Sequence, residues 1–144
     1  MNPSDLHNLQ RFIDAQDGVI EQALQELRAG LKQSHWMWFV FPQLAGLGRS
    51  PTAQFYGIRS LAEAQAYLAH PLLGTRLTSS FDALLSWRGR RSAEQIFGPV
   101  DALKLRSSGT LFDRASPTGI FGETLQSFFD GPDDLTLALL GQAE

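Results

Sequence analysis

Apolar residues recur at intervals of three and four along almost the whole chain, the spacing of one face of an α-helix. One clear run places Leu73, Leu77, Phe81 and Leu84 on a single stripe. Convincing alternation of apolar and polar residues, the mark of a half-buried strand, is absent from the sequence. With 144 residues, a length that suits one core, the chain is predicted to be all-α. We expect a single compact domain over residues 1–144, with about seven or eight short helices and short connections.

Local signals mark where several of these helices begin and end. Ser60 with Glu63, and Ser92 with Gln95, have the spacing of a capping box, which predicts helix starts at both places. Gly30 is a predicted C-terminal stop, because glycine tolerates the left-handed conformation there. Asp130, Asp133 and Asp134 are expected to cap a closing helix that begins near residue 134.

Composition indicates which kinds of binding partner and which cellular compartment suit the protein. The formal net charge is -3, which disfavours general nucleic-acid binding, because such binding depends on an excess of Lys and Arg. The chain has no cysteine, so disulfides and thiolate metal sites are excluded, and a reducing compartment is favoured. Neither a signal peptide nor an apolar run of about 20 residues is apparent. We therefore expect a cytoplasmic protein without membrane attachment.

The segment from Trp36 to Phe41 is apolar throughout, with His35 before it and Gln43 just beyond it. In one interpretation it lines a pocket, where Trp36 and Trp38 stack on a ligand and Gln43 supplies hydrogen bonds. His35 is then the candidate for proton transfer, because an imidazole titrates near neutral pH. In the other interpretation the tryptophans are plain core. The stretch 37–41 fits a strand or a buried helical turn.

A second candidate site lies further along the chain, around Lys104, Arg106, Ser107 and Ser108. Two cations beside small hydroxyl side chains are typical of an anion site, since arginine forms paired hydrogen bonds to phosphate or carboxylate. The alternative is close helix packing against small side chains, with Arg106 and Asp113 as a weak surface pair.

Other motifs are weaker. The loop 46–51 contains two glycines, but it lacks the third glycine and the Gly-Lys pair of nucleotide-binding loops, so it is either a ligand cover or a plain turn. His7, His35 and His70 lie on separate predicted elements, and no two have the spacing of a zinc site. We expect no metal and no cofactor.

Several segments of the sequence, 34–43, 46–50, 63–77 and 104–112, together resemble the signature of the domain of unknown function 1810 family. This resemblance implies a compact all-helical fold and supplies no activity, ligand or catalytic residue. Members are small bacterial proteins, some of them labelled calpastatin, and nothing in this chain supports a protease inhibitor. Gly18–Ile20 departs from the family pattern, which often has a proline and a tyrosine there. The positions that match the family's motif are His35, Trp36, Trp38, Gln43, Ser50, Tyr56, Lys104, Arg106 and Ser107.

Together these observations predict a protein that binds a small anionic ligand, phosphorylated or nucleotide-like, in a pocket between the aromatic segment and residues 104–108. Whether it is also an enzyme stays open, as do the reaction and the oligomeric state. The alternative is a protein-interaction module without catalysis, in which the indoles anchor a partner.

Overall fold

The computed structural model describes residues 5–117 and 119–143, and in these residues the chain is all-helical, as predicted. Seven helices have seven residues or more, and α3, α4 and α7 are shorter. No strand occurs in the described part, where the β-type pairing is a single bridge between Leu44 and Ile58. The helices are α1 Gln10–Gln16, α2 Ile20–Ala29, α3 Met37–Val40, α4 Pro51–Tyr56, α5 Leu61–Ala69, α6 Pro71–Leu85, α7 Ala93–Phe97, α8 Pro99–Ala115, α9 Ile120–Phe128 and α10 Asp134–Ala143.

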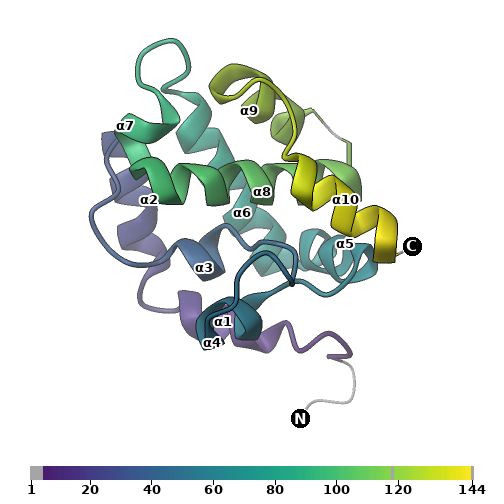
Figure 1. Ribbon diagram of the computed structural model, residues 1–144. Coiled ribbons are helices and arrows are strands. Elements are labelled where there is room, and N and C mark those ends of the chain that lie inside the picture. Colours follow the sequence, from purple (N-terminus) through teal and green to yellow (C-terminus); the bar gives the residue numbers. More distant parts are fainter. Residues whose placement is uncertain (1–4, 118, 144) are drawn as a thin grey trace.

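The longest helix, α8, organises the fold. It crosses the face of the molecule seen in Figure 1, and α5, α7, α9 and α10 all pack against it. Pro99 lies in its first turn, where a missing N–H costs nothing. Small residues such as Gly109 let neighbours approach, since a Cβ there would lie 3.3 Å from the side chain of Leu125 on α9. Four of the predicted site residues, Lys104, Arg106, Ser107 and Ser108, lie on α8.

The predicted helix signals are largely confirmed. Ser92 and Gln95 form a reciprocal capping box at the start of α7. Ser60 caps α5, but the Glu63 carboxylate accepts from the Arg59 N–H instead of closing the box on Ser60. Gly30 ends α2 with a φ of 74°. Asp133 accepts from the Thr136 N–H at the start of α10, as a capping residue does.

The aromatic segment contributes a helical turn, α3, to a core made largely of rings. Phe41 packs edge-on against Phe81, with ring centres 5.1 Å apart, and Phe81 packs in the same way against Phe121 at 4.9 Å. Phe41 and Phe81 have no exposed surface. The core therefore joins α6 and α9 to the residue that follows α3.

A buried ion pair fixes the segment that follows α4. Arg11 on α1 and Glu63 on α5 lie 2.6 Å apart, and both side chains are 2% exposed. The Arg11 guanidinium also donates to the carbonyls of Phe55 and Gly57. Arg11 thus anchors the end of α4 to α1 and α5.

In the described part of the chain, no helix combines the length and apolar character that a membrane span requires.

Candidate functional site

Glu26 on α2 holds the beginning of the aromatic segment. Its carboxylate accepts from the Ser34 hydroxyl, from the backbone N–H groups of Gln33 and Ser34, and from the Trp36 indole N–H at 3.0 Å. Burial by itself would raise the pKa of Glu26, but these hydrogen bonds outweigh it and lower the pKa from 4.5 to about 2. The carboxylate is therefore ionised at neutral pH and acts as the acceptor that the indole requires.

The two residues at the start of the segment, His35 and Trp36, have opposite environments. Trp36 is 1% exposed and packs against Phe41 and Phe97, so neither face of its ring is open to a ligand. His35 is exposed. Within the described residues, no side-chain hydrogen bond orients the His35 imidazole, and a positioned general base normally has such a partner.

Trp38 lines a narrow cleft together with two other residues that the sequence singled out, Gln43 and Tyr56. The cleft contains about 200 Å³ of empty space, but it is nowhere wide enough for a water molecule. Gly48 covers the indole edge, since a Cβ there would lie 3.4 Å from the ring and 2.7 Å from the Ala53 Cβ. We call this the Trp38 cleft; its remaining lining residues are Leu44, Gly48, Ala53 and Gly57.

Lys104 joins the second predicted segment to this cleft. Its ammonium lies 4.3 Å from the centre of the Trp38 ring, within cation–π range. Asp101 binds both Lys104 and Lys32, at 3.0 and 2.9 Å. Burial favours the neutral acid, but the two lysines outweigh that effect and lower the pKa of Asp101. Lys104 thus already has an anionic partner inside the protein, which it shares with Lys32.

Two of the three predicted serines, Ser50 and Ser107, have local structural roles. Ser50 caps α4 by accepting from the Ala53 N–H at 3.1 Å. Ser107 is buried, and its hydroxyl donates to the Leu103 carbonyl and lies 3.5 Å from the Asp133 carboxylate. Ser108 is 0% exposed, and its hydroxyl has no hydrogen-bond partner among the described residues. None of the three lines the Trp38 cleft.

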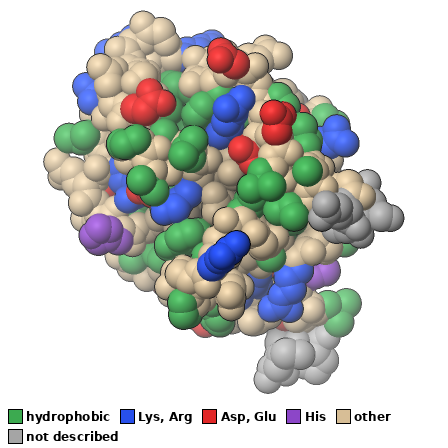
Figure 2. Space-filling view, viewed as in Figure 1, with side chains coloured by type: hydrophobic (Ala, Val, Ile, Leu, Met, Phe, Trp, Pro, Cys, Tyr) green, Lys and Arg blue, Asp and Glu red, His purple; other side chains and the backbone are tan. Residues whose placement is uncertain are grey.

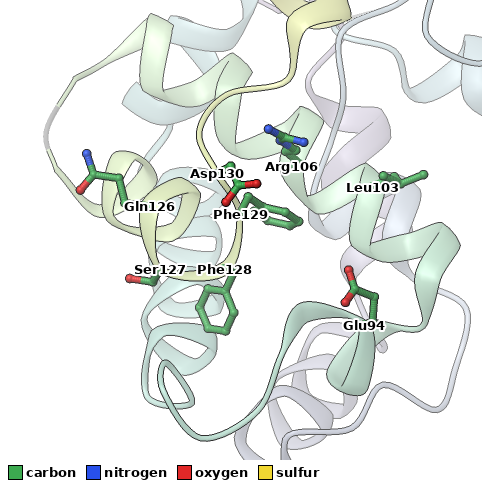
Figure 3. A pocket seen from close by; sticks show the side chains of 8 residues that line it. All are labelled: Glu94, Leu103, Arg106, Gln126, Ser127, Phe128, Phe129 and Asp130. Carbon is green, nitrogen blue, oxygen red and sulfur yellow. The ribbon is translucent and has the colours of Figure 1, made fainter.

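Arg106 lies in a different place, on the side of α8 that faces α9. It lines an open hollow of about 500 Å³ between α7, α8 and the end of α9 (Figure 3). This volume lies within the range of small-molecule sites. We call it the Arg106 hollow; its other lining residues are Glu94, Leu103, Gln126, Ser127, Phe128, Phe129 and Asp130.

The Arg106 guanidinium is fixed at one edge only. Its Nε–H donates to the Gly131 carbonyl at 2.9 Å, and the group lies 5.7 Å from the centre of the Phe129 ring. In the part of the chain that the structure describes, the two terminal nitrogens have no acceptor and no ion pair. Two parallel N–H donors of this kind match a carboxylate or phosphate.

The charges around the hollow are mixed. Glu94 and Asp130 share it with Arg106, although neither carboxylate is within ion-pair distance of the guanidinium. Two acids facing one base favour a ligand that has hydrogen-bond donors beside its anionic group. On the face seen in Figure 2, cations and acids are likewise interspersed with apolar side chains.

Three residues that shape these sites were not predicted from the sequence, namely Glu26, Asp101 and Phe129. Glu26 has no local signal, because it lies ten residues before the indole that it accepts from. Asp101 could have been identified from the sequence, because it lies three residues before Lys104 in the same predicted helix.

Among the described residues, no group of three His, Asp or Glu side chains is arranged to hold a metal ion.

Comparison with known proteins provides a family and a fold. A family model described as "Protein of unknown function (DUF1810)" matches residues 6–140. The crystal structure of the conserved hypothetical protein Rv1873 from Mycobacterium tuberculosis, at 1.38 Å, is similar to the chain with 52% identity. The match covers 94% of this chain and 97% of that one, with a TM-score of 0.91. No curated protein matches the sequence.

Proposed function

The chain belongs to the DUF1810 family of proteins of unknown function, and we propose that it binds a small anionic metabolite in the Arg106 hollow. The observation that carries the proposal is the Arg106 side chain, which lines an open hollow and whose terminal nitrogens have no acceptor among the described residues. Because its Nε–H is already bonded to Gly131, the guanidinium loses little conformational freedom when it binds. A cytoplasmic phosphorylated compound or carboxylate suits this donor pair.

The rest of the hollow restricts the body of the ligand. Phe128 and Phe129 offer partly exposed rings, which favour an apolar or planar portion. The carboxylates of Glu94 and Asp130 repel further negative charge and accept from hydroxyl or amino groups. A sugar phosphate, a nucleoside monophosphate or an amino acid has this combination of groups.

The Trp38 cleft is a weaker candidate for the same role. It gathers Trp38, Gln43 and Tyr56, but a ligand must first move the glycine loop that closes it. Lys104 is also already paired with Asp101, whereas Arg106 has no ion pair in the described residues. An anion at Arg106 therefore binds donors that no described group occupies.

The experiment is a thermal-shift screen followed by calorimetry with phosphate, sugar phosphates, nucleotides and carboxylates. An Arg–anion pair contributes about 1.5–3 kcal/mol, so Arg106→Gln and Arg106→Lys are expected to weaken the best probe by roughly 10-fold or more. Arg114→Gln, an exposed arginine at the far end of α8, is the matched control and leaves binding unchanged. If no probe binds the folded protein, or Arg106→Gln binds as tightly as the parent, the proposal is wrong.

The runner-up function is protein recognition. Val100 and Leu103 are each 65% exposed and lie one turn apart on α8, with Leu103 at the rim of the hollow. A protein partner, unlike a metabolite, loses affinity when Val100 is replaced by Ser. Small-anion binding through Arg106 is expected to survive that change, because Val100 does not line the hollow.

A further inference from the structure

A second hollow adjoins the Arg106 hollow on the other side of the end of α9. It has a volume of about 350 Å³ and shares two lining residues, Ser127 and Phe128, with the Arg106 hollow. Its other walls come from the connection between α6 and α7, including Arg90 and Arg91, and from Gln95 on α7. We call it the Arg91 hollow.

The two hollows differ in charge. Among the described residues, no acidic side chain lines the Arg91 hollow, whereas Glu94 and Asp130 line its neighbour. Arg90 and Arg91 therefore give it two positive charges, accompanied by the polar side chains of Ser92, Gln95 and Ser127. The Arg91 hollow is therefore suited to an anionic group.

Neither cation has an ion-pair partner among the described residues. The Arg91 Nε is buried without an acceptor in the described chain, and one terminal nitrogen donates to the Gln95 carbonyl at 3.1 Å. Arg90 is exposed and lies 4.6 Å from the centre of the Trp87 ring. Arg88, in the same connection, is by contrast paired with Glu123 at 3.1 Å.

Local packing keeps the Arg91 stem in place. The Trp87 indole N–H donates to the Leu27 carbonyl at 3.0 Å, which ties the end of α6 to α2. The Arg91 stem and the Trp87 ring both reach Gly30, where an added Cβ would lie 3.1 Å from the Arg91 Cδ and 2.7 Å from the ring. A side chain held in this way loses little entropy when it binds an anion.

We propose that the ligand of the Arg106 hollow has two anionic groups and extends over Phe128, with one group on Arg106 and the other on Arg90 and Arg91. This inference rests on the proposed function, because Arg106 must hold the first group. Joining the two groups makes the second contact intramolecular, so affinity rises once the link matches the separation of the two sites. The substrate class is thus a bis-phosphorylated molecule, or one with a phosphate and a carboxylate at opposite ends of an apolar or planar body.

A series of α,ω-alkanebisphosphonates of increasing chain length measures this separation directly by calorimetry. Alkyl monophosphonates of the same lengths are the matched ligands, because they have the same apolar body and one anionic group. We expect the bisphosphonate affinity to pass through a maximum at one chain length, at least 10-fold above the corresponding monophosphonate.

Three variants test which arginines bind each of the two anionic groups of the ligand. Arg106→Gln weakens both ligand series, whereas Arg90→Gln and Arg91→Gln remove only the bisphosphonate advantage and leave monophosphonate affinity within about 2-fold. Arg88→Gln is the control from the same connection and preserves the advantage, because Arg88 does not line either hollow. Arg90 is exposed, so its variant tests the inference even if the more buried Arg91 variant fails to fold.

The outcomes separate the two proposals. If monophosphonates bind through Arg106 but a second phosphonate adds no affinity at any length, the two-anion inference is wrong and the proposed function stands. An advantage that persists in Arg90→Gln and Arg91→Gln also overturns the inference. If Arg106→Gln leaves both series unchanged, the proposed function fails and the two-anion inference fails with it.

Discussion

Lys104 and Trp38, from segments far apart in the sequence, meet as a cation–π pair with the ammonium 4.3 Å from the ring centre. The pair joins α8 to the short turn α3, and Asp101 fixes the lysine from the other side. A cation lying on an indole stabilises the contact most when both groups are partly shielded from water, as Trp38 and Lys104 are. The contact therefore positions the aromatic segment against the central helix.

Replacing Lys104 with Gln is expected to lower the free energy of unfolding by about 1 kcal/mol, because the cation–π contact is lost. A double-mutant cycle with Trp38→Leu, which removes the aromatic ring, isolates that contact from the loss of the Asp101 ion pair. The measurement is urea denaturation followed by circular dichroism, which does not depend on the tryptophan that is changed. If the coupling energy in the cycle is zero within error, Lys104 and Trp38 contribute independently.

The position of Arg106 shows where the predicted site and the structure differ. Lys104 and Arg106 were predicted to form one anion site, but side chains two positions apart in a helix point about 160° away from each other around its axis. Lys104 accordingly contacts Trp38 while Arg106 lines the hollow near α9. The helical spacing in the sequence therefore already predicted that the two side chains point in different directions. Which part of the protein each of them contacts could not be predicted, because that depends on how helices distant in the sequence pack against α8.

The fold itself was predictable because its signals are local. Ser92 and Gln95 define the start of α7 within four residues, and Gly30 ends α2 without reference to any other helix. The environment of Trp36 was only half predictable. A buried indole N–H requires an acceptor, but the acceptor of Trp36, Glu26, is supplied by a neighbouring helix and is identified only once that helix is placed.

Glu26 is expected to make the stability of the fold depend on pH. Because its pKa is about 2 in the folded chain and ordinarily 4.5, its ionised form stabilises the fold fully above pH 4.5 and progressively less as the pH falls towards 2. Glu26→Gln is expected to cost about 2 kcal/mol at pH 7. Urea denaturation at pH 7, 4 and 3 measures the difference between parent and variant, which shrinks as the pH falls. A difference that stays constant over this range would contradict the lowered pKa.

The buried Arg11–Glu63 pair is expected to be far more sensitive than an exposed one. Removing one partner leaves an uncompensated buried charge, so Glu63→Gln or Arg11→Met costs about 3–5 kcal/mol. The matched control is the Arg88–Glu123 pair, whose side chains are each 57% exposed and whose loss costs less than about 1 kcal/mol. Thermal or urea unfolding compares the two pairs. Equal losses in both would show that burial does not set the cost here.

Replacing Ser108 is expected to stabilise the fold, in contrast to the substitutions described above. Its hydroxyl is 0% exposed and has no hydrogen-bond partner in the described chain, so the fold bears the cost of desolvating a polar group without a compensating bond. Ser108→Ala is therefore expected to raise the free energy of unfolding by roughly 1 kcal/mol. Ser80→Ala is the control, because Ser80 is equally buried but donates to the Arg76 carbonyl at 2.8 Å and is not expected to stabilise the fold when it is replaced. Urea denaturation of the parent and both variants measures the difference, and a loss of stability in Ser108→Ala would show that this hydroxyl does have a partner in solution.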